Sequence, residues 1–212
     1  MNLLFLGDSI TDAYHCFDPE NLGEGYVRMI YEKLNSDPNG SCCFDAAAKF
    51  LVSNKGIDGF TVSRVYGMWQ SLPNKSRWDT VSVLVGINDV GAWMDCGHSD
   101  SWINGAVLDF ARTYEDLVTD FLDYNIRQIL LMEPFLFPCP ENYQLWMPWR
   151  KKLSSHIQSI ARRYGGTFLP LQDVLENAAR MEGASAITPD GIHLTERGNR
   201  LLADCWLKRF PH

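Results

Sequence analysis

The chain has 212 residues and a formal net charge of −7, and both values narrow its function. An acidic protein is repelled by polyanions, so nucleic acids and anionic membrane surfaces are disfavoured as main partners. A chain of this length buries enough surface to be stable without disulfides or metal ions. We therefore expect one globular domain over residues 1–212.

Targeting signals and cysteine motifs are the next features that bear on function. The sequence has no basic segment followed by an apolar signal-peptide core and no apolar run of about 20 residues, so we expect a cytoplasmic protein. The cysteines form no CxxC pair and show no ligand spacing with histidine. We expect free thiols that act as small apolar residues, and no bound metal. These cysteines are Cys16, Cys42, Cys43, Cys96, Cys139 and Cys205.

Short apolar runs alternate with amphipathic segments along the chain. The first run, residues 2–6, ends at Gly7, and its length and composition are typical of a buried parallel strand. Five such alternations predict a parallel sheet covered on both faces by helices. The expected strands are 2–6, 50–52, 80–85, 129–132 and 167–169, and the expected helices are 23–34, 61–72, 104–124, 146–164, 171–181 and 195–210.

Residues with strong local preferences mark the ends of these elements. Thr61 and Thr195 are expected to cap two helices, and Gly165 is expected to end a third. The sequence Asp-Pro-Asn-Gly at 37–40 predicts a turn. The polar, tryptophan-bearing segment 91–104 is expected to form an ordered insertion or a lid.

Residues suited to acyl transfer follow the predicted strands. Ser9, Gly59 and Asn88 follow the first three strands, and Asp190 and His193 precede the last helix. The carboxyl ends of parallel strands meet at one edge of a sheet, where ligands bind. A serine nucleophile needs a histidine base and a carboxylate that orients the histidine. The Ser9 and Gly59 N–H groups and the Asn88 amide could stabilise an oxyanion, and such donors are each worth about 10²–10³ in kcat.

Four sequence blocks resemble the conserved blocks of the SGNH (GDSL-type) hydrolases, in the order of that family. They are Gly-Asp-Ser-Ile-Thr-Asp at 7–12, Asn-Lys-Gly-Ile-Asp-Gly at 54–59, Gly-Ile-Asn-Asp at 86–89 and Asp-Gly-Ile-His at 190–193. The resemblance implies a flavodoxin-like three-layer α/β/α sandwich with a five-stranded parallel sheet and no cofactor. It also implies a catalytic triad of Ser9, Asp190 and His193, and an oxyanion hole formed by Ser9, Gly59 and Asn88.

Within this family the chain is most similar to intracellular acetyl-xylooligosaccharide esterases. The similarity lies at residues 23–27, 54–57, 83–90 and 134–135. One departure is Pro189, which stands where members of that group carry an aromatic residue before the triad aspartate. The resemblance therefore implies deacylation chemistry, but it does not imply that the pocket wall next to Pro189 accepts a xylose unit. It also suggests a homo-oligomer.

Other polar and aromatic residues have competing interpretations. Asp8, Asp12 and Asp89 are expected to support the loops structurally, and His15 and His98 could line the pocket. Four tryptophans are expected on the catalytic side of the sheet, where indole faces could stack on sugar rings. The alternative places them in the core or at a subunit interface. They are Trp93, Trp102, Trp146 and Trp149.

Three functions compete at this stage. The first is a serine esterase that acts through an acyl-enzyme. It removes a small acyl group, with acetyl as the first expectation, from a carbohydrate or another small soluble ester. The second is a lipolytic or thioester hydrolase with the same triad and an apolar channel for the acyl chain. The third is a carbohydrate-binding protein without catalysis, which would not need Asp190 behind His193.

Overall fold

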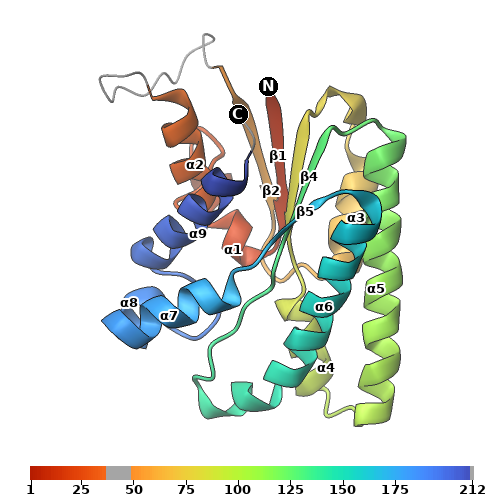
Figure 1. Cartoon of the computed structure of the whole chain (residues 1–212), viewed down its shortest axis with the longest axis vertical. Coiled ribbons are helices and arrows are strands. Elements are labelled where there is room, and N and C mark those ends of the chain that lie inside the picture. The colour runs from red at the N-terminus through yellow and green to blue at the C-terminus, as the bar shows by residue number, and fades with distance from the viewer. Residues whose placement is uncertain (37–48, 211–212) are drawn as a thin grey trace.

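A computed structural model describes residues 1–36 and 49–210 (Figure 1). The predicted turn at 37–40 and the cysteines Cys42 and Cys43 lie outside the described residues. Within the described residues, five parallel strands form one sheet in the order β2-β1-β3-β4-β5. This is the strand order of flavodoxin-like folds, and it confirms the expected fold class. The strands are β1 (Asn2–Gly7), β2 (Leu51–Gly56), β3 (Thr80–Leu84), β4 (Gln128–Met132) and β5 (Thr167–Leu169).

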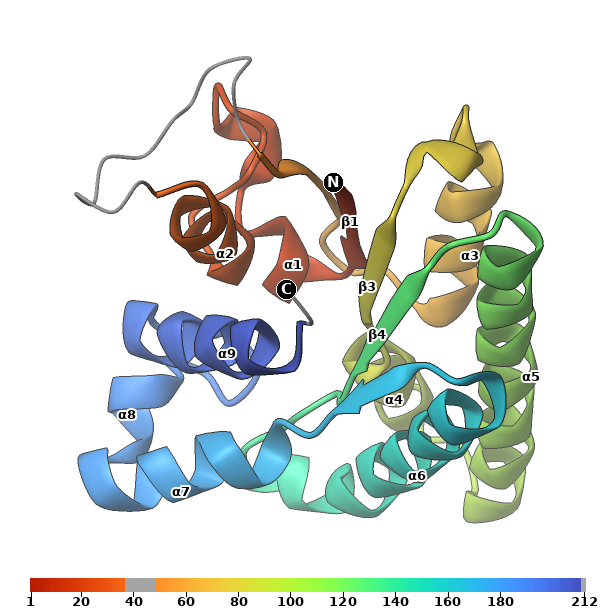
Figure 2. The same cartoon turned by 45° about the horizontal axis from the view of Figure 1, so that its top comes forward.

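Helices cover both faces of the sheet, which makes a three-layer sandwich (Figure 2). One layer contains α1 (Ser9–Asp12), α2 (Tyr26–Asn35), α7 (Gln172–Glu182), α8 (Ala184–Ile187) and α9 (Glu196–Arg209). The other contains α3 (Val62–Ser71), α4 (Ile87–Asp95), α5 (Asp100–Asp123) and α6 (Met147–Tyr164). Short 3-10 turns occur at η1 (His15–Phe17), η2 (Lys75–Arg77) and η3 (Glu141–Leu145).

Strand β1 lies at the centre of the core, paired with β2 on one side and β3 on the other. Its residues from Leu3 to Gly7 are all buried. Phe5 packs against Trp206 of α9 and Tyr26 of α2, with ring centroids 5.4 and 5.9 Å away. Burying each large apolar side chain contributes about 1.5–3 kcal/mol, so this strand is a rigid support for the turn that follows it.

The segment 91–104, which was expected to form an ordered insertion or a lid, is ordered and largely helical. Helix α4 continues to Asp95, and α5 begins at Asp100, four residues before the predicted start. The Ser99 side chain caps α5 by accepting a hydrogen bond from the Trp102 N–H at 3.3 Å. Because serine at an N-cap satisfies a free helical N–H, it starts a helix where polar composition alone suggests a loop.

Two of the three predicted helix-end residues act as the sequence suggests, and one does not. Thr195 accepts a hydrogen bond from the Gly198 N–H at 3.2 Å and begins α9. Gly165 ends α6 in the left-handed conformation with φ of 71°. Thr61 stands at the N-cap of α3, but its side chain makes no capping bond.

The thiols of the described cysteines are free, as expected, but most are not buried. Cys16, Cys96 and Cys139 are exposed and Cys205 is partly buried. The expectation that they act as small apolar residues therefore gains no support from burial at the three exposed ones. Among the described helices, none combines the length and the apolar character that crossing a bilayer requires.

Candidate active site

Ser9 is the first residue of α1 and directly follows the turn at the carboxyl end of β1. A Cβ atom on Gly7 would lie 2.2 Å from Thr11 Oγ1 and 2.5 Å from the Leu84 carbonyl oxygen, so only glycine fits there. Asp8 caps α1 by accepting a hydrogen bond from the Ile10 N–H at 3.1 Å. Because β2 and β3 lie on opposite sides of β1, the half-buried Ser9 stands at the topological switch point of the sheet.

Ser9, His193 and Asp190 form a continuous chain of hydrogen bonds. His193 Nε2 lies 3.0 Å from Ser9 Oγ, and His193 Nδ1 lies 2.6 Å from Asp190 Oδ2. Asp190 Oδ1 also accepts the backbone N–H groups of Ile192 and His193, at 2.9 and 2.8 Å. Partial burial opposes ionisation of Asp190, but the bonds from the His193 side chain and these N–H groups outweigh it and hold its pKa below the ordinary value.

The ionised Asp190 determines which nitrogen of His193 carries the proton. A carboxylate can only accept, so Nδ1 donates its N–H to Asp190 and Nε2 is left to accept the Ser9 hydroxyl proton. Both side chains of the Asp190–His193 pair are 48% exposed. The arrangement therefore has the geometry of a nucleophile with its base, open to a substrate from the solvent.

The turn that carries His193 is anchored to the segment after β4. Gly191 has φ of +93°, and a Cβ atom there would lie 2.0 Å from the Cys139 carbonyl oxygen. The Gly191 N–H donates to Thr188 Oγ1 at 2.8 Å, and its carbonyl accepts the Phe137 N–H at 2.9 Å. Glycine at this position allows the close approach that fixes His193 beside Ser9.

The three expected oxyanion donors are available for a ligand. As the first residue of α1, Ser9 has an N–H without an intrahelical acceptor. Gly59 has φ of +70° and an exposed backbone. No acceptor among the described residues is assigned to either N–H group. One N–H of the Asn88 side-chain amide binds the Phe60 carbonyl at 3.1 Å, which leaves the other free.

Asn88 and Asp89 together hold the loop that carries Gly59. While Asn88 binds the Phe60 carbonyl, the Asp89 carboxyl accepts the Val62 N–H at 3.1 Å. Asp89 is only 6% exposed, and burial raises its pKa to about 8. This geometry agrees with the expectation that Asp89 orders the loop.

Asp8, directly before the nucleophile, is the second buried acid at this edge. It is 1% exposed, and burial raises its pKa to about 7. Its hydrogen bond from Ile10 favours the charged form, but desolvation is the larger effect. The structure thus gives Asp8 the supporting role that the sequence predicts, inside the turn and not on its surface.

A groove of about 1390 Å³ extends from Ser9 and His193 between η1, α2 and α9. Two aromatic side chains of the groove wall, Tyr14 and Phe17, are 70% and 87% exposed. Sequence reasoning did not single out these two residues. Their position directly after the sequence block that contains Ser9 could have indicated that they lie near the site. The direction of the chain there depends on the positive φ of 63° at Tyr14, which the sequence pattern does not predict.

The four expected sugar-stacking tryptophans do not line this groove. Trp146 and Trp149 are each only 7% exposed and belong to the core, so the expectation of open indole faces is corrected for both. Trp146 packs against Gly91, where even a Cβ atom would lie 3.1 Å from its ring. Trp93 and the 48% exposed Trp102 line a separate hollow of about 420 Å³ beside α3 and α5.

The two histidines expected near the pocket also differ from that expectation. His98 lies between α4 and α5, outside the groove, and stacks on Trp102 of α5 with ring centroids 3.6 Å apart. His15 is 6% exposed and binds Asp12, so its ring lies behind the groove wall. Neither approaches Ser9 as His193 does.

Comparison with known proteins identifies the family of this chain. The GDSL-like lipase/acylhydrolase family profile matches residues 5–201. An acetylxylan esterase from Geobacillus stearothermophilus is 27% identical over 97% of this chain and 92% of its own. A crystal structure of a catalytic mutant of that organism's acetylxylan esterase Axe2 superimposes with a TM-score of 0.79 at 24% identity, covering 99% of this chain and 94% of Axe2. A protein from Parabacteroides merdae described as a GDSL-like lipase gives a TM-score of 0.82 at 24% identity, covering 98% and 94%.

Proposed function

Because the chain belongs to the GDSL-like lipase/acylhydrolase family and is a carboxylic ester hydrolase, we propose that it removes acetyl groups from a short acetylated carbohydrate. The observation that carries this proposal is the contact of Ser9 Oγ with His193 Nε2 at 3.0 Å, with Asp190 bound behind the imidazole at 2.6 Å. This arrangement supports an acyl-enzyme mechanism that needs neither a metal ion nor an organic cofactor.

In the proposed first half-reaction, Ser9 Oγ attacks the acetyl carbonyl carbon while His193 Nε2 takes the hydroxyl proton. Asp190 stabilises the imidazolium that forms. The negative charge on the former carbonyl oxygen is met by the Ser9 and Gly59 N–H groups and the free N–H of Asn88. Collapse of the tetrahedral intermediate breaks the ester bond, and His193 returns the proton to the departing sugar oxygen.

In the second half-reaction, water replaces the sugar hydroxyl as the partner of His193. His193 Nε2 takes a proton from this water, whose oxygen attacks the carbonyl carbon of the acetyl-Ser9 ester. The same three donors stabilise the second oxyanion. Collapse breaks the bond to Ser9 Oγ, which takes the proton back from His193, and releases acetic acid, which loses its proton to the solvent as acetate. This restores the resting enzyme.

The preference for a small acyl group on a bulky alcohol rests on similarity and on shape. The relative from Geobacillus stearothermophilus is an acetylxylan esterase, and the triad side chains lie open on a broad groove. An open groove accommodates a sugar chain on the alcohol side of the ester. Pro189, exposed on this groove, offers no aromatic face, so we propose an acetylated oligosaccharide without restricting it to xylose. We further propose that the enzyme acts in the cytoplasm on short substrates.

A panel of acetylated xylo-oligosaccharides, acetylated amino sugars, acetylated sialic acids and p-nitrophenyl esters of increasing chain length tests this proposal. We expect acetate release from at least one sugar class, and faster turnover of p-nitrophenyl acetate than of the octanoate. Ser9→Ala should abolish turnover while the melting temperature stays within about 2 °C of the parent, since only one hydroxyl at the half-buried Ser9 is removed. Full activity of this variant would refute Ser9 as the nucleophile.

A lipolytic or thioester hydrolase is the second candidate, and the apolar part of the groove favours it. Met29 of α2, Leu207 of α9 and Leu194 just before α9 all line the same hollow as Ser9. These side chains could receive an acyl chain, since apolar surface gains about 25 cal/mol per Å² on burial. Preference for octanoyl over acetyl esters in the panel would decide for this candidate.

A further inference from the structure

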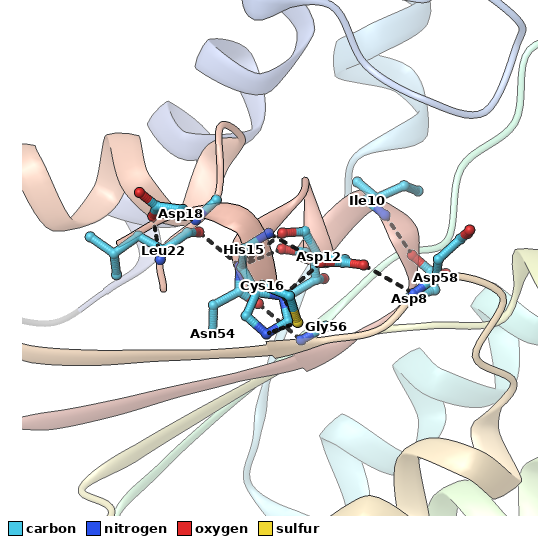
Figure 3. A network of polar contacts seen from close by, with 12 residues as sticks. Asp8, Ile10, Asp12, His15, Cys16, Asp18, Leu22, Asn54, Gly56 and Asp58 are labelled. Carbon is cyan, nitrogen blue, oxygen red and sulfur yellow. Dashed lines mark hydrogen bonds and ion pairs between the residues drawn. The ribbon is translucent and has the colours of Figure 1, made fainter. Parts of the chain in front are cut away.

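A second cluster of reactive side chains lies one helical turn beyond the nucleophile, at Asp12, His15 and Cys16 (Figure 3). Each residue offers an atom that can bind a metal ion, and these atoms all lie within 4.8 Å of one another. Asp12 ends α1, and His15 and Cys16 open η1. The proposed hydrolysis assigns no role to His15 or Cys16.

His15 is oriented by Asp12 on one side and faces Cys16 on the other. His15 Nδ1 lies 2.6 Å from Asp12 Oδ1, and the same oxygen accepts the His15 backbone N–H at 3.2 Å. A carboxylate acceptor keeps the proton on Nδ1, so Nε2 carries a free lone pair. The Nε2 atom lies 3.5 Å from Cys16 Sγ, and Nδ1 lies 4.0 Å from the same sulfur.

We propose that His15 Nε2 and Cys16 Sγ bind a thiophilic divalent cation, with Zn²⁺ as the best match, and that Asp12 supports the imidazole from behind. Zinc binds nitrogen at about 2.0 Å and thiolate sulfur at about 2.3 Å, so two tetrahedral ligands of these types stand about 3.5 Å apart. The distance between His15 Nε2 and Cys16 Sγ is 3.5 Å, which equals the separation expected for two zinc ligands. Imidazole and thiolate together favour zinc over calcium or magnesium.

The support by Asp12 follows a recurrent arrangement of metal-binding histidines. Such histidines donate their other N–H to a carboxylate, which fixes the ring and raises the basicity of the ligand nitrogen. Asp12 also accepts the Asp58 N–H through its second oxygen, at 3.2 Å. Asp12 is thereby held from two sides, and its carboxylate is only 20% exposed.

The backbone around the cluster is fixed before any metal arrives. The Asn54 side-chain amide of β2 donates to the carbonyl oxygens of Thr11 at 2.6 Å and Leu22 at 2.8 Å. Gly56 lets β2 approach so closely that a Cβ atom there would lie 2.2 Å from the Asp12 N atom. A preorganised site loses little conformational freedom on binding.

The cluster is accessible from one side only. His15 is buried, whereas Cys16 is exposed and lines the groove together with Asp12. A cation bound here would lie in the wall of that groove, with its remaining coordination positions open to water or to oxygen atoms of a ligand. Binding does not depend on ester hydrolysis, so this inference stands apart from the proposed function.

Titration of the full-length protein with Zn²⁺ tests the proposal. All variants should carry Cys42→Ser and Cys43→Ser, because these thiols lie outside the described residues and could bind zinc on their own. We expect one tightly bound Zn²⁺ by native mass spectrometry and release of about one proton from the thiol by calorimetry. Co²⁺ in place of Zn²⁺ should give a thiolate-to-cobalt charge-transfer band.

Substitutions separate the cluster from adventitious binding. Cys16→Ser should weaken Zn²⁺ binding at least tenfold and remove the cobalt band, and Asp12→Asn should weaken binding by about 10–100-fold. The matched control Cys139→Ser removes another exposed thiol and should bind like the parent, as should the inactive Ser9→Ala. Melting curves without metal verify folding. Equal affinity of the Cys16→Ser and Cys139→Ser variants, or no bound Zn²⁺ in the parent, would overturn the proposal.

Discussion

Two pairs of the form Asp-x-x-His flank the same groove, and they differ in what the far nitrogen of the histidine meets. In both pairs an aspartate oxygen lies 2.6 Å from histidine Nδ1 and the backbone N–H of the histidine binds the same aspartate. Nε2 of His193 faces Ser9 at the start of a helix, beside three free hydrogen-bond donors. Among the described residues, the partner recorded for Nε2 of His15 is the thiol of its chain neighbour, Cys16.

Burial separates the two pairs further. The His193 side chain is 48% exposed, whereas that of His15 is 8% exposed. A base must reach the substrate and the leaving group, which the open pair can do and the covered pair cannot. In both pairs the aspartate specifies the histidine tautomer, and the different surroundings support the separate roles that we propose, a base for His193 and a metal ligand for His15.

The largest expected effect separates the two aspartates. Asp190→Asn should lower kcat by about 10⁴, because an amide can hold His193 in the wrong tautomer and does not stabilise the imidazolium. Asp12→Asn is the matched change in the other pair and should cost less than about tenfold, through its bond to Asp58 beside Gly59. Steady-state kinetics on p-nitrophenyl acetate measures both. Similar losses in the two variants would contradict the assignment of separate roles.

Next in size is the loss of an oxyanion donor, a feature that we assign to the Ser9 site alone. Asn88→Ala should lower kcat by about 10²–10³, equivalent to roughly 3–4 kcal/mol, with little change in KM. Asn104→Ala removes an exposed amide from α5 and serves as the control. A rise in KM at constant kcat would instead indicate that Asn88 only binds the ground state.

The buried acid that holds the Gly59 loop should make stability depend on pH. The folded-state pKa of Asp89 is raised to about 8 from an ordinary value of 3.8, so the folded protein binds more protons than the unfolded chain between these values. Stability should therefore fall as pH rises from about 4 to 8, by a few kcal/mol at most, since each pKa unit corresponds to about 1.4 kcal/mol.

Asp89→Asn tests this dependence, because an amide oxygen can still accept the Val62 N–H. Urea unfolding at pH 6 and pH 9 should show the variant gaining stability relative to the parent at the higher pH. Asp123→Asn, at an exposed carboxyl at the end of α5, should show no such gain. A parallel pH response in parent and Asp89→Asn would exclude Asp89 as the source.

The smallest expected effect concerns the helix that follows His193. Thr195→Ala removes the capping bond from the Gly198 N–H and the bond that the hydroxyl donates to the Ala186 carbonyl. It should cost about 1 kcal/mol or somewhat more, and 1 kcal/mol corresponds to about 2–4 °C in Tm for a chain of this size. Thr61→Ala is a matched control, because Thr61 stands at an N-cap without a capping bond. Equal changes in the melting temperature of the two variants would show that the Thr195 bond contributes nothing.

Sequence patterns predicted the features that depend on short-range order. Strand β1 is buried on both faces, so its apolar run is continuous. The end of this run identifies the turn that carries Ser9. Edge strand β2 was predicted too short, since its pairing with β1 extends it through the polar residues Ser53 to Gly56. Backbone pairing with a neighbour overrides local composition there.

The features that patterns missed depend on side-chain direction and on rare backbone conformations. Trp146 and Trp149 do lie after β4, as expected, but position along the chain does not reveal that their rings point into the core. The cluster of Asp12, His15 and Cys16 forms because Ala13 and Tyr14 adopt positive φ values of 42° and 63°. Neither Ala13 nor Tyr14 is a glycine, so the sequence gives no sign of this turn. The spacing of the three residues also matches no common zinc motif.

The contact between His193 and Ser9 joins residues 184 positions apart in the chain. Contacts of such separation form late, because the entropy of closing a long loop is lost before the contact returns any energy. A nascent chain therefore carries a serine without a base until the turn before α9 has been synthesised and has docked on the finished sheet. Under the proposed mechanism, ester turnover therefore reports completion of folding, and a premature stop anywhere before His193 should leave a chain that does not form the acyl-enzyme.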